Sequence, residues 1–201
     1  MGPNGAGKTT LLKVLTLLTP TSSGEIHIAG RKVSGNSLAE RKKMGVISHS
    51  TFLYGNLTAY ENLMFYGRLY DVDNLKQRIK EVINEVGLRY SLNDPVRTFS
   101  RGMQQRLAIA RAIIHNPDIL FLDEPYTGLD QHAIEILNKV LLNLANQQRT
   151  IYMITHNFEQ GLNLSDRVII LVSGRIVFEA PGKEMALEKL KEKYLHCVEE
   201  N

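Results

Sequence analysis

Cysteine is almost absent from this 201-residue chain, and long apolar runs are missing altogether. Cys197 stands alone, so no disulfide can form within one chain, and a reducing compartment is expected. The longest apolar stretches, such as 168–172, fall far short of the roughly 18 residues that a membrane-spanning helix requires. The first residues also lack a basic-then-apolar signal pattern. We therefore expect a cytoplasmic protein that does not cross a membrane by itself.

Blocks of like charge are absent as well. The 24 basic and 21 acidic residues are spread along the chain and leave a formal net charge of +3. This balance gives no electrostatic reason to expect a nucleic-acid partner. With 43% hydrophobic and 22% charged residues, the composition is ordinary for a globular protein that buries one substantial core.

Apolar periodicity predicts helices that alternate with short strands. The predicted helices cover 8–18, 59–70, 75–86, 102–114, 131–146 and 183–198. The predicted strands cover 25–29, 45–48, 119–123, 150–155, 167–172 and 175–179. The segments 119–122 and 151–154 are nearly continuous apolar runs with a long helix between them, which is typical of a parallel sheet buried on both faces.

Between Tyr54 and Met103 the strands stop and helical patterns take over. This change predicts a helical subdomain at 54–103, inserted into an α/β core made of 1–53 and 104–201. We expect the whole chain, 1–201, to form a single α/β domain with a mostly parallel sheet.

Residues 2–9, Gly-Pro-Asn-Gly-Ala-Gly-Lys-Thr, fit the phosphate-binding pattern G-x-x-x-x-G-K-[ST] ahead of a helix-compatible run. Glycines let backbone N–H groups turn inward around a phosphate, and the start of the following helix attracts anions. Lys8 is expected to reach the β- and γ-phosphates of ATP, and Thr9 to bind Mg²⁺. The other residues expected to contact the nucleotide here are Asn4, Gly5, Ala6, Gly7 and Thr10. A glycine-rich turn before a helix is the structural alternative.

Only Met1 precedes this loop, whereas a strand leads into it in P-loop folds. We therefore expect the N-terminal strand of the sheet to be missing, through either a misassigned start or a real truncation.

The segment 117–125 is an apolar strand that ends in two adjacent carboxylates, Asp123 and Glu124. This is the Walker B arrangement of P-loop proteins. Asp123 is expected to hold Mg²⁺ through water. Glu124 is expected to polarise the water that attacks the γ-phosphate, because phosphoryl transfer depends on positioning and charge stabilisation. An acidic surface turn is the structural alternative.

The segment Phe99–Met103, with the helical pattern that follows at 104–112, resembles the signature motif of ABC ATPases. The resemblance implies the P-loop fold of that family, ATP hydrolysis, and a head-to-tail pair, formed either as a homodimer or with a related ATPase subunit. In the family, the Ser and Gly of this motif contact the γ-phosphate held by the opposite subunit, which carries that role over to Ser100 and Gly102. Arg101 and Met103 depart from the commonest form, LSGGQ. An N-capping serine is the structural reading, and it holds in either case.

Further landmarks follow in the family's order. Residues 127–130 resemble the D-loop of the dimer interface, and Thr155-His156 resembles the switch histidine, which implies that His156 contacts the γ-phosphate. His49 stands where most members carry the Q-loop glutamine, with a solvated loop histidine as the alternative. No residue can be assigned to the family's N-terminal aromatic, which stacks on adenine.

Members of the family work with transmembrane permease subunits, so the resemblance places the chain on the inner face of the cell membrane, with partner contacts at 52–61. The segments 45–58 and 61–70 and the signature variant resemble the ATPase of haem exporters used in cytochrome c biogenesis. Related drug and polysaccharide exporters share much of these segments.

The expected function is therefore that of the ATP-hydrolysing subunit of an ABC transporter, with haem export as its finer form. One alternative is a truncated, non-catalytic nucleotide-binding fragment. An unrelated P-loop enzyme such as a small-molecule kinase would have no need of a signature helix, or of Glu124 after Asp123.

Overall fold

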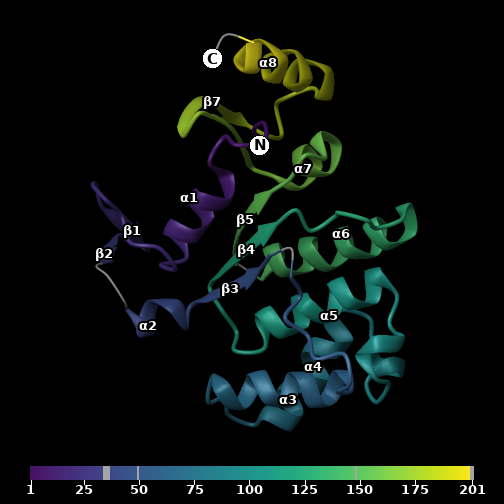
Figure 1. The fold of residues 1–201 in the computed structure, drawn as a ribbon. Helices are drawn as coiled ribbons and strands as arrows, with labels where there is room; N and C mark the ends of the chain where they lie inside the picture. The colour runs from purple at the N-terminus through teal and green to yellow at the C-terminus, as the bar shows by residue number, and fades with distance from the viewer. Residues whose placement is uncertain (34–36, 49, 148, 200–201) are drawn as a thin grey trace. The chain divides into compact units, whose positions relative to one another are not determined.

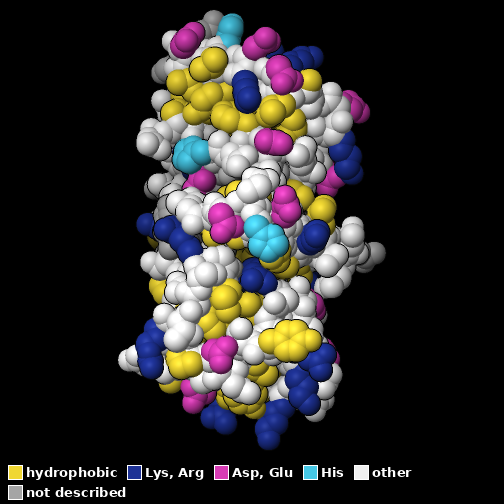
Figure 2. Space-filling view, turned by 90° about the vertical axis from the view of Figure 1, so that its right-hand side faces the viewer, with side chains coloured by type: hydrophobic (Ala, Val, Ile, Leu, Met, Phe, Trp, Pro, Cys, Tyr) yellow, Lys and Arg dark blue, Asp and Glu magenta, His cyan; other side chains and the backbone are white. Residues whose placement is uncertain are grey.

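The computed structural model describes residues 1–33, 37–48, 50–147 and 149–199 (Figure 1). The chain divides into two compact units, one made of Met1–Ser37 with Met153–Asn201 and the other of Leu38–Tyr152. Across the described residues, no helix has both the length and the apolar character needed to span a bilayer. On the face drawn in Figure 2, Lys and Arg side chains lie interspersed with Asp and Glu.

In the first unit, the glycine-rich loop leads into α1, Lys8–Leu15. The prediction that this helix continues to residue 18 was wrong, because Leu17 adopts a left-handed backbone with φ of 59°. The N–H of Leu18 then donates to the carbonyl oxygen of Lys13 at 2.8 Å, and the N–H of Leu17 donates to that of Val14 at 3.0 Å. This pair of bonds is the Schellman pattern that ends a helix.

The first unit contains two antiparallel strand pairs. They are β1, Ile26–Ile28, with β2, Arg31–Val33, and β6, Arg167–Val172, with β7, Arg175–Pro181. The bounds of β6 confirm the prediction from its apolar run. Sequence reasoning missed β2, because three residues with two basic side chains carry no recognisable alternation.

Helices α7, Phe158–Leu164, and α8, Leu187–Glu199, complete this unit. α8 buries Leu190 in a core that it shares with Ile170 of β6. The prediction that this last helix begins at residue 183 was wrong, because the chain first makes a turn in which the N–H of Met185 donates to the carbonyl oxygen of Gly182.

The second unit contains a parallel strand pair. After α2, Leu38–Arg41, strand β3, Met44–Ile47, runs parallel to β4, Ile119–Asp123. Strand β5, Thr150–Ile154, lies on the far side of β4 in the order of this sheet, and its first three residues belong to the second unit. The predicted parallel sheet is therefore confirmed for β3 and β4.

The longer helices of this unit lie on one side of β3 and β4 in the view of Figure 1. They are α3, Ala59–Leu69, α4, Leu75–Glu85, α5, Arg101–Ile113, and α6, Gln131–Asn146, with short 3-10 turns η1, Arg89–Ser91, and η2, Val96–Thr98. Gly45 lets α5 lie close to β3, because a Cβ at this position would stand 2.4 Å from the carbonyl oxygen of Ala112. The start of α3 is set by a capping box between Thr58 and Glu61.

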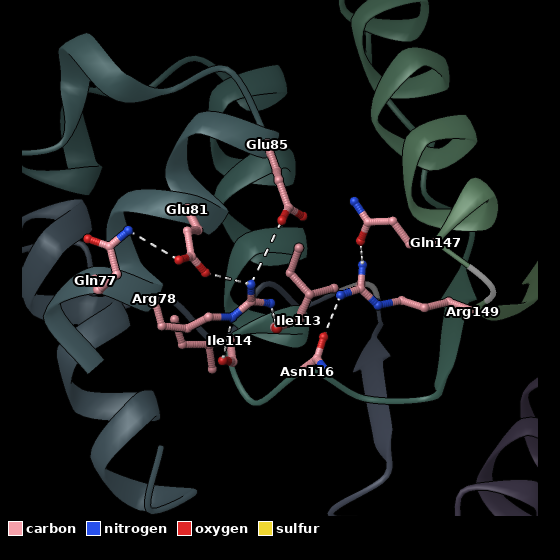
Figure 3. Close-up of polar contacts among 9 residues, drawn as sticks. All are labelled: Gln77, Arg78, Glu81, Glu85, Ile113, Ile114, Asn116, Gln147 and Arg149. Atoms are coloured by element: carbon pink, nitrogen blue, oxygen red, sulfur yellow. Dashed lines mark hydrogen bonds and ion pairs between the residues drawn. The ribbon is translucent and has the colours of Figure 1, made fainter. Parts of the chain in front are cut away.

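Two arginines hold the end of α5 in place (Figure 3). Arg78 of α4 donates from Nη2 to the carbonyl oxygen of Ile113 at 2.8 Å and forms an ion pair with Glu81 at 3.3 Å. Arg149 donates from Nη2 to Oδ1 of Asn116 at 2.7 Å, just beyond the helix. The Arg78 guanidinium thereby satisfies carbonyl groups at the end of α5, where the helix dipole favours a cation, and Arg149 holds the chain that follows.

Candidate functional site

The glycine-rich loop is anchored on the β6–β7 hairpin of its own unit. The N-terminal amino group of Met1 donates to the carbonyl oxygen of Ile169 at 2.7 Å, and the N–H of Leu171 donates back to that of Met1 at 2.9 Å. Further along the loop, the N–H of Gly174 donates to the carbonyl oxygen of Ala6 at 2.9 Å. A Cβ at residue 2 would stand 2.1 Å from the carbonyl oxygen of Leu171, so only glycine fits this close approach.

Lys8 lies over the loop that it follows. Its Nζ donates to the carbonyl oxygens of Gly2 at 2.7 Å and of Pro3 at 2.8 Å. Gly7, with φ of 95°, occupies the N-cap of α1 and supplies no side-chain acceptor. The first N–H groups of a helix have no acceptor within the helix, so this end of α1 can bind an anion.

The other predicted residues of this loop also lie around the start of α1. Asn4 and Gly5 are exposed, whereas Ala6 is buried with an exposed fraction of 3%. Thr9 and Thr10 are exposed on the first turn of the helix.

His156 belongs to the same unit as the loop. It is exposed two residues after the end of β5, between the buried Thr155 and Asn157, which caps α7. A Cβ at Gly161 of α7 would stand 2.5 Å from Cε of Met1 and 3.0 Å from Cγ2 of Thr155. The start of the loop and the segment before His156 therefore pack on the same helix.

Asp123 and Glu124 lie in the second unit, at the carboxyl end of β4. Asp123 is buried, with an exposed fraction of 4%. Burial raises the pKa of the neighbouring Tyr152, and the negative charge of Asp123 raises it further. Glu124 is half-buried and holds a left-handed backbone with φ of 53°.

Glu124 lines a polar pocket of about 510 Å³. Residues from two other segments share its wall, among them Ser48, Thr51, Arg101 and Gln104, together with Thr127 of the loop that follows Glu124. A half-buried carboxylate among hydroxyl, amide and guanidinium groups is suited to orienting a water molecule. The first turn of α5 thus contributes to the surroundings of Glu124, which sequence reasoning missed.

Ser100 is the N-cap of α5, and its Oγ accepts a hydrogen bond from the N–H of Met103 at 3.3 Å. Gly102 follows, and a Cβ there would stand 2.8 Å from Cβ of Ala133 on α6. The α5 start and the α6 start therefore pack directly on each other. Asp130 caps α6 by accepting from the N–H of Ala133 at 2.7 Å.

The structure brings the predicted residues together in two groups. The loop and His156 are in one unit, whereas Asp123, Glu124, Ser100 and Gly102 are in the other. His49 lies outside the described residues. The arginine at position 101, where the commonest signature motif has glycine, was evident from the sequence. No neighbouring residue indicated which segment its side chain contacts.

Comparison with known proteins adds a family match. A family model described as ABC transporter matches residues 1–127. The chain is 38% identical over 195 residues to the ABC transporter ATP-binding protein NatA of Bacillus subtilis, covering 96% of this chain and 77% of that protein. It is 37% identical over 196 residues to the bacitracin transport ATP-binding protein BcrA of Bacillus licheniformis, covering 97% of this chain and 63% of that protein.

The fold itself has close solved counterparts. The structure of cbiO1 from Clostridium perfringens, described as part of the ABC transporter complex cbiONQ, superposes with a TM-score of 0.86 at 24% sequence identity. The match covers 96% of this chain and 80% of that one. The predicted α/β fold with a helical region is thereby confirmed.

Proposed function

This chain belongs to the ABC transporter family as one of its ATPases, and on that premise we propose that it binds and hydrolyses ATP to drive transport through separate membrane subunits. The observation that carries the proposal is the anchored loop ahead of α1, in which Lys8 lies over carbonyl oxygens and the helix start is free of side-chain caps. Such a site suits a triphosphate.

In this proposal the loop of 4–10 surrounds the phosphates of ATP. Backbone N–H groups of Gly5, Ala6 and Gly7 and the first turn of α1 donate to phosphate oxygens. Lys8 exchanges its carbonyl acceptors for the β- and γ-phosphates, which replaces hydrogen bonds to neutral oxygens by bonds in which both partners are charged. Asn4 and Thr10 are proposed to contact the nucleotide at the two ends of this loop.

Mg²⁺ fits the donor chemistry of the chain. Mg²⁺ prefers oxygen ligands and is commonly bound by one or two carboxylates together with substrate phosphates and water. Among the described residues, no group of three or more His, Cys, Asp or Glu side chains is placed to hold a metal ion, so the protein would contribute few ligands. The hydroxyl of Thr9 and the carboxylate of Asp123 are the proposed donors, and the ion would supply charge neutralisation on the phosphates.

For the reaction itself, Glu124 accepts a hydrogen bond from the attacking water and orients it toward the γ-phosphate. His156 donates to a γ-phosphate oxygen. Ser100 and Gly102, at the start of α5, would contact the γ-phosphate held by a second ATPase subunit, either another copy of this chain or a related one. His49 is proposed to take the place of the Q-loop glutamine.

The partner in the membrane is proposed to dock on an aromatic surface formed by Phe52, Tyr54, Phe65 and Leu69. Their exposed fractions are 60%, 49%, 44% and 66%, respectively. Tyr54 and Phe65 meet edge to face with 5.3 Å between ring centroids. Phe65 and Leu69 also line a shallow pocket of about 510 Å³ on the surface of α3. Clustered exposed aromatic and apolar side chains are typical of protein-binding surfaces.

This docking would place the chain on the cytoplasmic face of the membrane. In this arrangement the membrane subunits, and not this chain, bind the transported substrate. Haem export, and with it a role in cytochrome c biogenesis, remains a prediction from the segments around His49, and the relatives reported above carry other names. Because the chain covers 63% of BcrA, the activity of a whole relative is carried over here only as a proposal.

The decisive experiment is the substitution Glu124→Gln. We expect ATP turnover to fall by about two orders of magnitude or more while ATP binding persists, because only the oriented water is lost. ATP-bound pairs should accumulate in size-exclusion chromatography with Mg²⁺ and ATP. Glu135→Gln, an exposed acid on α6, serves as the matched control.

The outcomes separate the candidate functions. Unchanged turnover in Glu124→Gln would reject Glu124 as the catalytic group. A native chain that binds ATP without any turnover would favour the non-catalytic fragment. Phosphoryl transfer to a small molecule instead of water would favour a kinase.

A further inference from the structure

Arg101 lies at the start of α5 and contacts the loop at Gly128, which joins Glu124 to α6. Resting on the function proposed above, we propose that Arg101 is a positioning residue that holds this loop, and through it Glu124, in the geometry that hydrolysis requires.

The contact between Arg101 and Gly128 is close. A Cβ at Gly128 would stand 2.5 Å from Cζ and 2.7 Å from both Nε and Nη1 of Arg101. The guanidinium plane therefore lies directly against the Cα of Gly128. Gly128 has φ of 72°, so glycine also suits the backbone conformation of the loop at this point.

Two consecutive turns connect this contact to Glu124. The N–H of Leu129 donates to the carbonyl oxygen of Tyr126 at 3.2 Å, and the N–H of Thr127 donates to that of Glu124 at 3.2 Å. A displacement of Gly128 thus reaches the backbone of Glu124 through two hydrogen-bonded turns. Because Glu124 holds a left-handed backbone, it requires support from its surroundings.

The loop is supported from the other side by α6. Tyr126 is buried, and its hydroxyl donates to Oδ1 of Asn138 at 2.8 Å. Asp130 is fixed by its role as the N-cap of α6. Between these two anchors, Gly128 is exposed on the surface, and the Arg101 guanidinium contacts it on the side where a Cβ would stand. Arg101 therefore adds a contact from α5 to a loop that α6 holds at Tyr126 and Asp130.

The chemistry of the side chain matters for this role. A guanidinium is planar and can lie flat against a backbone segment, whereas a lysine ammonium is a compact, strongly hydrated charge on a flexible stem. Arg101 also lines the pocket that contains Glu124, together with Gln104 of the next helical turn. One residue of the signature segment thus contacts both the loop and the surroundings of the catalytic carboxylate.

The test measures ATP turnover as a function of ATP concentration in Arg101→Ala and Arg101→Lys. We expect kcat to fall about tenfold in both variants, with KM for ATP changed less than twofold, because the nucleotide is held by the loop before α1. Arg89→Ala, an exposed arginine on η1, is the control and should keep the native kcat. Native kcat in Arg101→Ala would overturn the inference, and so would full activity in Arg101→Lys.

A double-variant cycle checks the route through Gly128. Gly128→Ala should displace the guanidinium and lower kcat, and adding Arg101→Ala should lower kcat no further. Additive losses in the double variant would mean that Arg101 acts elsewhere, and the inference would fail. Urea unfolding of each variant separates a loss of folded protein from a loss of kcat.

The same assays keep this inference distinct from the proposed function. If Glu124→Gln retains turnover, the proposed function itself fails. If Glu124→Gln loses turnover but Arg101→Ala does not, only the role of Arg101 is rejected.

Discussion

Arg78 and Arg106 cap each other's helices. Arg78 of α4 donates to the carbonyl oxygens of Ile113 at 2.8 Å and Ile114 at 3.2 Å, at the end of α5 (Figure 3). Arg106 of α5 donates from Nη1 to those of Val86 and Gly87, both at 3.1 Å, at the end of α4. Each helix thus receives a cation at its negative end, which fixes how α4 lies along α5.

Arg78→Ala is expected to lower the free energy of unfolding by about 2 kcal/mol, because two helix-end carbonyl groups lose a charged donor. Urea unfolding followed by circular dichroism measures the change. Lys80→Ala, an exposed residue of the same helix, should change stability by less than about 0.5 kcal/mol. Equal effects of the two substitutions would contradict the capping role.

Gly45→Ala is expected to destabilise the protein by about 1–3 kcal/mol. The added Cβ would stand 2.4 Å from the carbonyl oxygen of Ala112 and 2.9 Å from Cδ1 of Leu120, so α5 must move away from β3. Gly55→Ala is the matched control, because its Cβ would meet Cβ of Arg97 at an ordinary 3.8 Å. Thermal unfolding of both variants measures the difference, and a similar melting temperature for the two would contradict the close packing.

His115 is expected to make stability depend on pH. Burial is the main cause that lowers its pKa to about 4; the positive charges of Arg111 and Arg78 act in the same direction, and a hydrogen bond with the carbonyl oxygen of Met44 opposes them. Its ring stacks on that of Tyr70 with 3.9 Å between centroids. The folded pKa lies below the unfolded value near 6.5, so the unfolded chain binds more protons between these two values.

The stability that His115 contributes is therefore complete above about pH 6.5 and decreases by an amount on the order of 2 kcal/mol as pH falls toward 4. His115→Phe keeps an aromatic ring against Tyr70 and removes the titration. Its urea midpoint should fall less steeply between pH 6.5 and 4 than that of the native chain. His132→Phe, at an exposed histidine, should keep the native slope, and equal slopes for all three proteins would reject the assignment to His115.

Phe65→Glu is expected to weaken attachment to the membrane subunits by about tenfold or more, because a charge would replace the centre of the aromatic surface. Co-sedimentation with membranes that carry the chain's own permease subunits measures the attachment. Leu142→Glu places the same charge on α6 at a side chain of similar exposure, 46% against 44%, and should attach normally. Equal attachment of both variants would show that the membrane subunits bind at another surface.

Much of the fold was predictable, because the relevant signals are local. The apolar run at 167–172 and the helix at 131–146 were predicted with the bounds of β6 and α6. The predicted end of α1 and the predicted start of α8 were wrong. The left-handed backbone at Leu17 ends α1 early, and a turn from Gly182 to Met185 comes before α8. Leu17 is not the glycine that usually occupies the left-handed position at a helix end, and the turn after Gly182 delays the start of α8 to Leu187.

The residues that define the family were evident from the amino-acid sequence by itself. The phosphate loop, the paired carboxylates and the serine before α5 depend on residue types within a few positions of each other, and backbone geometry follows directly from such spacing. Only the tertiary structure decided that Arg101 lies against Gly128 and that Arg78 reaches the end of α5. Those contacts join segments that are distant along the chain, and their geometry depends on how α4, α5 and α6 pack together.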